Sequence, residues 1–123
     1  MKQAVCIIMK NKNKVRVVNR PNSNLLALPG GKVEDGETLE QAIVREVFEE
    51  TGIAIYQDEF TKLYEGVCEG EVNYYVTCFV MNHDNLSWCK GSEPDIESFV
   101  VDIPDFLREN AFLEFNKAAF ALL

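Results

Sequence analysis

Histidine and closely paired cysteines are scarce in this sequence. Only His83 is a histidine among the 123 residues, and the four cysteines include no C-x-x-C pair. A zinc ribbon and a thioredoxin-type redox motif both need such pairs, and a two-histidine metal site needs a second histidine. The sequence therefore argues against all three kinds of site.

The chain also lacks an excess of basic residues. Its 12 lysines and arginines face 20 aspartates and glutamates, which gives a net charge of −8. A nucleic-acid polymer and an anionic membrane surface both require a basic face on the protein, so we expect neither as a partner. A polyanionic small molecule is compatible with this charge if a divalent cation offsets the acids.

Long apolar runs are absent as well. No segment approaches the roughly 20 apolar residues that a membrane-spanning helix needs. The apolar run within the opening MKQAVCIIMKNKNK is too short for a signal peptide. We therefore expect a cytoplasmic protein with reduced cysteines.

What the sequence does contain fits one globular domain, residues 1–123, with 47% apolar and 26% charged residues. Apolar and β-branched runs predict strands at 3–9, 15–18, 25–28, 60–70, 72–81 and 99–103. We expect Pro29, Gly30 and Gly31 to end the third of these strands, and the segment after 104 to form one or two helices. This order favours an α/β sandwich with a mixed sheet, although other α+β folds share it.

The clearest predicted helix runs from Thr38 to Glu50. Thr38 followed by Gln41 is the pattern of a capping box, and Gly52 stands where a helix-ending glycine belongs. A helical period of about 100° per residue predicts an apolar face made of Ile43, Val44, Val47 and Phe48.

Three acids crowd the end of this helix, in the run REVFEETG at 45–52. Glu46, Glu49 and Glu50 have the spacing of one helical face, where like charges repel by about 0.2–0.5 kcal/mol per pair. Two explanations compete: a solvated helix face, or a cation site in which a metal ion relieves the repulsion.

The spacing of this run from the preceding glycines favours the second explanation. The segment GKVEDGETLEQAIVREVFEETGI, from Gly31 to Ile53, resembles the Nudix box, the signature of the Nudix hydrolase family. The resemblance implies an α/β/α sandwich around a mixed sheet. It also implies an enzyme that splits a nucleoside diphosphate linked to a moiety X, with Mg²⁺, or Mn²⁺ in its place, as the cofactor.

The resemblance also implies roles for individual residues. Hard cations such as Mg²⁺ bind carboxylate and carbonyl oxygens and share them with substrate phosphates. The metal ligands it implies are the Gly30 carbonyl, Glu46, Glu49, Glu50 and a late-loop acid, for which Glu97 is the first choice and Glu93 the reserve. Arg45 would orient the catalytic glutamates, of which Glu46 or Glu49 is the general base. Gly31, Glu37 and Gly52 would have structural roles.

Further similarity is to the MutT-type branch of the family, which hydrolyses (d)NTPs, including oxidised purine nucleotides, to (d)NMP and pyrophosphate. Arg20 and Lys32 stand where that branch has basic phosphate contacts, and Asn116 where its asparagine reads the purine. Hydrolysis of ADP-ribose, nucleotide sugars or dinucleoside polyphosphates and non-catalytic nucleotide binding are the alternatives. We expect a monomer or a homodimer.

Overall fold

A mixed β-sheet forms the centre of the molecule. The computed structural model describes residues 1–21 and 23–123. Strand β1 (Lys2–Asn11) runs parallel to β6 (Tyr74–Asn82), with Ile7 opposite Phe79, and β5 (Thr61–Cys68) adds to β6 in the antiparallel sense. The parallel pair of strands comes from segments more than 60 residues apart, so the sheet ties the two halves of the chain together.

The other side of β1 carries short antiparallel strands. β2 (Lys14–Asn19) forms a hairpin with β1, and both β3 (Leu26–Ala27) and β7 (Glu97–Asp102) pair with β2. β4 (Gly30–Lys32) pairs with β1 near its start. Within the described residues the sheet has seven strands, with β3-β2-β1-β6-β5 as its main path.

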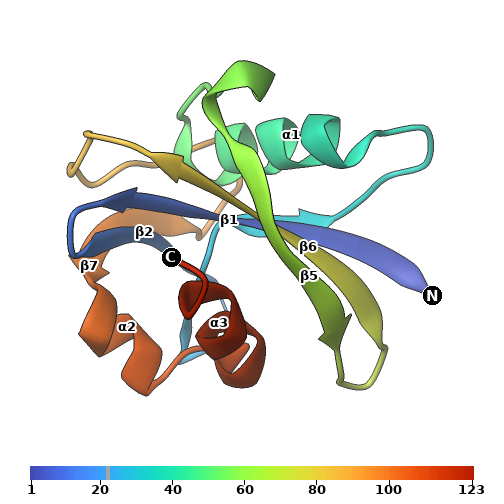
Figure 1. Ribbon diagram of the computed structural model, residues 1–123. Coiled ribbons are helices and arrows are strands. Elements are labelled where there is room, and N and C mark those ends of the chain that lie inside the picture. The colour runs from blue at the N-terminus through green and yellow to red at the C-terminus, as the bar shows by residue number, and fades with distance from the viewer. Residues whose placement is uncertain (22) are drawn as a thin grey trace.

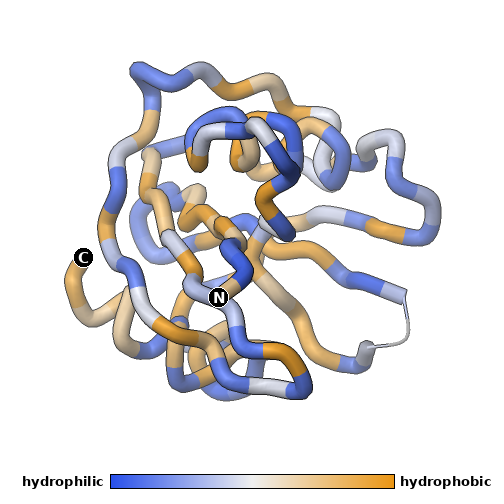
Figure 2. The backbone as a smooth tube through the Cα atoms, turned by 90° about the vertical axis from the view of Figure 1, so that its right-hand side faces the viewer, coloured by the Kyte–Doolittle hydropathy of each residue, from blue (hydrophilic) through white to orange (hydrophobic). Residues whose placement is uncertain are grey.

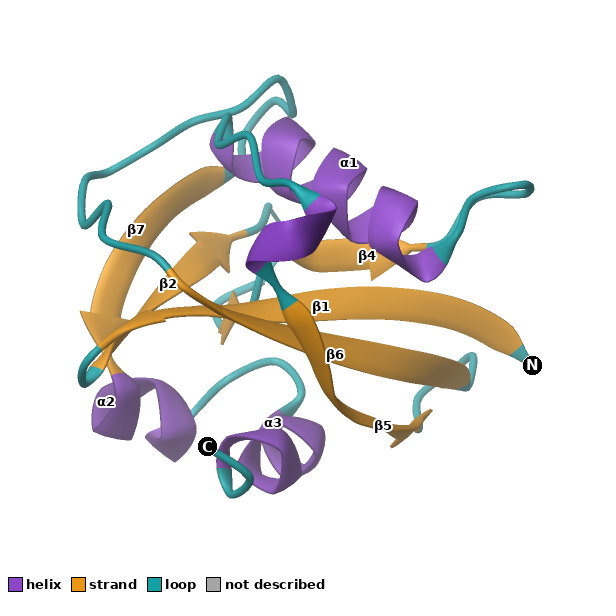
Figure 3. Ribbon diagram, turned by 45° about the horizontal axis from the view of Figure 1, so that its top comes forward, coloured by secondary structure: helices purple, strands orange, loops and turns teal. Residues whose placement is uncertain are grey.

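Helices cover both faces of the sheet (Figures 1 and 3). α1 (Leu39–Thr51) lies on one face together with the short 3-10 helix η1 (Gln57–Glu59). α2 (Ile103–Arg108) and α3 (Leu113–Phe120) lie on the other. The predicted α/β/α sandwich with a central mixed sheet is therefore confirmed, and the C-terminal segment forms two helices.

Each face of the sheet has its own apolar core. Successive side chains of a strand point to opposite faces, so Ile7 packs towards α1 with Ile43 and Val47, whereas Ile8 packs towards the C-terminal helices with Phe106. In Figure 2 hydrophobic segments are frequent along the strands inside the molecule, and several outer turns are hydrophilic.

The predicted ends of α1 are both confirmed. The Gln41 backbone N–H donates to Thr38 Oγ1 at 3.0 Å, and the Thr38 N–H donates to Gln41 Oε1 at 2.9 Å, which completes the capping box. Gly52 has φ of 75°, a left-handed conformation that favours glycine, and its N–H donates to the carbonyl of Phe48 at 2.9 Å.

One further strand was not expected, and one expectation about α1 is wrong. The third strand ends before Pro29 as expected, but Gly30 and Gly31 then begin β4; a Cβ on Gly30 would lie 2.1 Å from the carbonyl oxygen of Val5, so glycine lets the backbones approach. Phe48 is not in the core but 54% exposed, because the buried side of α1 continues from Val47 to Glu50 and Thr51. Burial of Glu50 is the more consequential of the two findings.

No helix among residues 1–21 and 23–123 has the length and apolarity to cross a membrane.

The capping box gives a first prediction. Thr38→Ala removes the oxygen that accepts the Gln41 N–H, and loss of such a cap lowers the free energy of unfolding by about 1 kcal/mol. Urea unfolding followed by circular dichroism measures the change. Thr38→Ser keeps the hydroxyl and should retain most of the stability; equal losses in both variants would contradict the role of the cap.

Candidate active site

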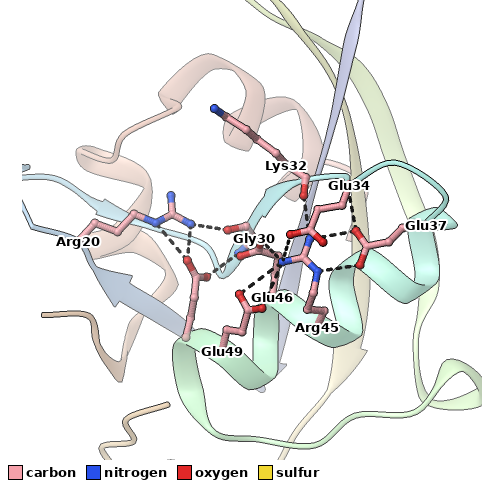
Figure 4. A network of polar contacts seen from close by, with 9 residues as sticks. Arg20, Gly30, Lys32, Glu34, Glu37, Arg45, Glu46 and Glu49 are labelled. Carbon is pink, nitrogen blue, oxygen red and sulfur yellow. Dashed lines mark hydrogen bonds and ion pairs between the residues drawn. The ribbon is translucent and has the colours of Figure 1, made fainter. Parts of the chain in front are cut away.

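The carboxylates of the acidic run gather where α1 meets β4. Glu46, Glu49 and Glu50 come from the last two turns of α1, and Gly30 comes from the start of β4 (Figure 4). Arg20 follows the last residue of β2 and reaches the same place. Segments distant in the sequence thus supply acids, a backbone carbonyl and a guanidinium to one site.

Arg45 is the centre of an ion-pair network (Figure 4). Its Nε and Nη2 donate to the two carboxylate oxygens of Glu37 at 2.7 and 3.0 Å, a bidentate arrangement. Its Nη1 donates to Glu46 Oε1 at 2.7 Å and lies 3.4 Å from the Glu49 carboxylate, and its Nη2 also donates to the Lys32 carbonyl at 3.0 Å. The guanidinium therefore joins the loop before α1, strand β4 and two of the three acids. These hydrogen bonds hold the pKa of Glu37 below its usual value.

Glu46 is enclosed between Arg45 and the glycines of β4. A Cβ on Gly31 would lie 2.6–2.7 Å from the Glu46 carboxylate, so the missing side chain leaves room for it. Burial, aided by the like charges of Glu50 and Glu49, raises the pKa of Glu46 to about 7 despite the opposing hydrogen bond from Arg45. Glu46 is thus a carboxylate that exchanges its proton near neutral pH.

Glu50 is a buried carboxylate with two polar partners. Its side chain is 5% exposed. Oε1 accepts the Gly30 N–H at 2.9 Å, and Oε2 accepts from Arg20 Nη2 at 3.0 Å and from Nε at 3.3 Å. Arg20 Nη2 also donates to the Gly30 carbonyl at 2.6 Å. Burial raises the pKa of Glu50, and the charge of Arg20 opposes that rise.

The donor set fits a hard divalent cation. Carboxylates and a backbone carbonyl are oxygen ligands of the kind that Mg²⁺ prefers, and the effect of Glu49 and Glu50 on the pKa of Glu46 reports the mutual repulsion that a cation would relieve. Within the described part of the chain, no three His, Cys, Asp or Glu side chains converge enough to hold a metal as they lie. Arg45 and Arg20 engage the carboxylates instead.

The late loop brings a different acid to this site from the one expected first. The Glu93 N–H donates to the Glu49 carbonyl at 3.0 Å, and the Glu93 charge contributes to the raised pKa of Glu50. Glu97 is exposed, at the first position of β7 and opposite Asn19. A Cβ on Gly91 would lie 2.2 Å from the Glu49 carbonyl oxygen, so this glycine lets the loop approach α1 closely.

A cavity of about 450 Å³ lies next to the acidic cluster. The three residues predicted to bind substrate, Arg20, Lys32 and Asn116, all line it, together with Tyr74, Phe112 and Phe115. Asn116 is buried, and its Nδ2 donates to Asn110 Oδ1 at 2.8 Å. Walls of this kind, largely apolar with a few polar groups, are typical of small-molecule sites.

Sequence reasoning missed several residues at this cavity, among them Cys6, Cys68, Phe112 and Phe115. It also missed Asn110, whose side-chain oxygen accepts a hydrogen bond from the amide of Asn116. The alternation of β1 carried a signal for Cys6, because it lies two positions from the inward-facing Ile8. Cys68 and Asn110 had no comparable signal, since their contacts depend on how β5 and the C-terminal helices pack.

Comparisons with known proteins identify the family of this chain. The family model for the NUDIX domain matches residues 1–121. A MutT-like protein of Streptomyces ambofaciens is 33% identical over 72 residues, which cover 58% of this chain and 47% of that protein. Two further relatives match 41% of this chain: ADP-ribose pyrophosphatase of Methanocaldococcus jannaschii, 49% identical over 31% of its length, and 8-oxo-dGTP diphosphatase of Escherichia coli, 48% identical over 42%.

The matches span less than half the length of these three relatives. Among solved structures, one from a study of MutT of Aliivibrio salmonicida and Vibrio cholerae superimposes with a TM-score of 0.74 at 22% identity, covering 98% of this chain and 95% of that one. At 22% identity, this structural similarity establishes the fold alone.

The raised pKa of Glu46 predicts how stability depends on pH without metal. A free glutamate titrates near pH 4.5, so the folded protein binds more protons between pH 4.5 and about 7. The free energy of unfolding should therefore fall as pH rises through this range, by about 3 kcal/mol on account of Glu46. Urea unfolding in EDTA at several pH values measures the slope.

Glu46→Gln should flatten this slope, because it removes the titrating group. Glu114→Gln, at a side chain that is 90% exposed, is the matched control and should keep the wild-type slope. An unchanged slope in Glu46→Gln would show that Glu46 does not titrate with a raised pKa.

Proposed function

Because this chain belongs to the NUDIX family, we propose that it hydrolyses the pyrophosphate bond of a nucleoside diphosphate linked to a moiety X. The favoured substrate is a (d)NTP, an oxidised purine nucleotide included, with (d)NMP and pyrophosphate as products. One observation carries the proposal: Gly30, Gly31 and Arg20 line a cavity of about 450 Å³, and the carboxylates of Glu46 and Glu50 lie against these same three residues. We further propose that residues 1–123 act as one catalytic domain.

We propose that Mg²⁺, or Mn²⁺ in its place, is the cofactor. The residues that would hold it are the Gly30 carbonyl, Glu46, Glu49, Glu50 and an acid of the late loop. For that last ligand, the hydrogen bond between Glu93 and the end of α1 supports Glu93 over Glu97. When bound, such an ion neutralises phosphate charge and positions the reacting phosphorus.

The general base is Glu46 or Glu49. A catalytic base works best with a pKa near the working pH, and burial raises the pKa of Glu46 to about 7, which favours Glu46. Arg45 keeps its proton at all working pH values and holds Glu46 at 2.7 Å, so it fixes the carboxylate that accepts the proton from water. Gly31, Glu37 and Gly52 support this arrangement by leaving room for Glu46, anchoring Arg45 and ending α1.

The substrate would bind in the cavity. Arg20 lines the cavity and contacts Glu50, so it would supply positive charge to phosphates held beside the acidic cluster. Lys32 adds a second positive charge to the wall, over the ring of Tyr74, and Asn116 supplies a polar group for the base between apolar walls. ADP-ribose is the second candidate, because the ADP-ribose pyrophosphatase and the 8-oxo-dGTP diphosphatase match this chain over equal shares. A nucleotide sugar, a dinucleoside polyphosphate or nucleotide binding without catalysis are further alternatives.

The net charge of −8 argues against a nucleic-acid polymer as a partner. That the protein is a monomer or a homodimer, and that it lies in the cytoplasm, both stay predictions.

A phosphate-release panel tests this function. The protein with Mg²⁺ is assayed on NTPs, dNTPs, oxidised dGTP, ADP-ribose, nucleotide sugars and dinucleoside polyphosphates. We expect turnover of a (d)NTP that EDTA abolishes and Mg²⁺ or Mn²⁺ restores. Glu46→Gln and Glu49→Gln should lower kcat by about 10²-fold or more, as loss of a general base does. Near-normal turnover in both variants, or a rate that EDTA leaves intact, would refute the proposed chemistry.

The two late-loop acids can be separated by matched substitutions. Glu93→Gln should raise the Mg²⁺ concentration needed for half-maximal activity by about tenfold, the usual scale for weakening a metal site. Glu97→Gln removes the same charge four residues away and should leave that concentration close to wild type. A raised Mg²⁺ requirement in Glu97→Gln, with Glu93→Gln close to wild type, would identify Glu97 as the ligand instead.

A further inference from the structure

Arg20 occupies the oxygen atoms that the proposed function assigns to the metal. Its Nη2 donates to the Gly30 carbonyl at 2.6 Å and to Glu50 Oε2 at 3.0 Å, and its Nε lies 3.3 Å from the same carboxylate oxygen. Figure 4 shows the guanidinium directed at Gly30 from the side opposite Arg45. The singly charged guanidinium of Arg20 thus bridges the Gly30 carbonyl and the buried Glu50 carboxylate.

The guanidinium and a divalent ion compete for these oxygens. Glu50 Oε2 accepts from both Nη2 and Nε of Arg20, which engages both of its lone pairs, and Oε1 accepts the Gly30 N–H at 2.9 Å. Mg²⁺ binds oxygen at about 2.0–2.1 Å, closer than the guanidinium nitrogens lie, and repels a second positive charge. Binding of an ion to Glu50 Oε2 would therefore replace at least one hydrogen bond from Arg20, and the repulsion between the two positive charges favours movement of the guanidinium away from the ion.

The same contacts explain why Arg20 is needed when no metal is bound. A buried carboxylate without a partner is strongly destabilising, and the Glu50 side chain is only 5% exposed. Arg20 supplies the partner and joins the end of β2 to β4 and α1. The site is thereby kept assembled in the absence of metal.

The Arg20 side chain also has a second position available to it, in the cavity. Its side chain is 30% exposed, and it lines the cavity next to the acidic cluster. It follows the last residue of β2, so its backbone is outside the sheet. A guanidinium released from Glu50 would face the end of the cavity where the phosphates are proposed to bind.

We propose that Arg20 is the built-in counter-cation of the metal-free site, and that it exchanges with the divalent ion. Arg20 holds Gly30 and Glu50 until the ion binds, and then turns to the phosphates of the nucleotide. This inference rests on the proposed function, because it requires the metal site. Its consequence is that Arg20 weakens metal binding to the nucleotide-free protein.

Binding of Mn²⁺ alone to the nucleotide-free protein tests the exchange. Titration calorimetry, or the electron paramagnetic resonance of free Mn²⁺, gives the dissociation constant. Arg20→Gln should bind Mn²⁺ about fivefold more tightly or better, the lower end of ordinary coupling between sites. Arg20→Lys keeps the charge and should stay within about twofold of wild type by the same measure. Lys14→Gln removes an equal charge from the other end of β2, where Lys14 pairs with Asp102, and should match wild type.

A measurement on the wild-type protein covers the case in which Arg20→Gln does not fold. The Nε–H resonance of Arg20, identified by its loss in Arg20→Lys, should shift on titration with Mg²⁺ as the guanidinium leaves Glu50. An unmoved resonance, or equal Mn²⁺ affinity in Arg20→Gln and Lys14→Gln, would overturn the exchange and leave the proposed function intact. Failure of every protein to bind Mn²⁺ would overturn both.

Discussion

Burial of carboxylates at the end of α1 is the constraint on which the rest of the site depends. Burial is the main cause of the raised pKa of Glu46 and of Glu50, and the like charges of Glu49 and Glu50 add to it at Glu46, so the site needs positive charge beside these groups. Arg45 pairs with Glu46 and Glu49 from the same helix, and Arg20 pairs with Glu50 from the end of β2. Removal of either guanidinium would leave a partly or fully buried charge without compensation.

Close backbone approach makes this arrangement possible. Gly30 lets β4 lie against β1, Gly31 leaves room for the Glu46 carboxylate, and Gly91 lets the late loop reach the end of α1. At each position an added Cβ would meet a neighbouring atom at less than 3 Å. The glycines therefore determine which oxygens converge, and the charged side chains determine what those oxygens can bind.

In the proposed function, the acidic cluster would hold the metal ion and the cavity would hold the nucleotide. The cluster carries oxygen ligands suited to a divalent cation, and the cavity combines apolar walls with Lys32 and Asn116. Arg20 belongs to both, since it contacts Glu50 and lines the cavity. A change of partner at this one residue would link the metal to the nucleotide.

Local sequence determined much of this protein: the strands other than β4, the limits of α1 with its capping box and Gly52, and the spacing of the acids from Gly31. These features depend on contacts within a few residues, which a sequence displays. Only the tertiary structure decided that Glu50 is buried and Phe48 exposed, that Glu93 rather than Glu97 hydrogen-bonds to the end of α1, and that Arg20 reaches Gly30. Each of these results depends on the packing of segments many residues apart, which local periodicity does not encode.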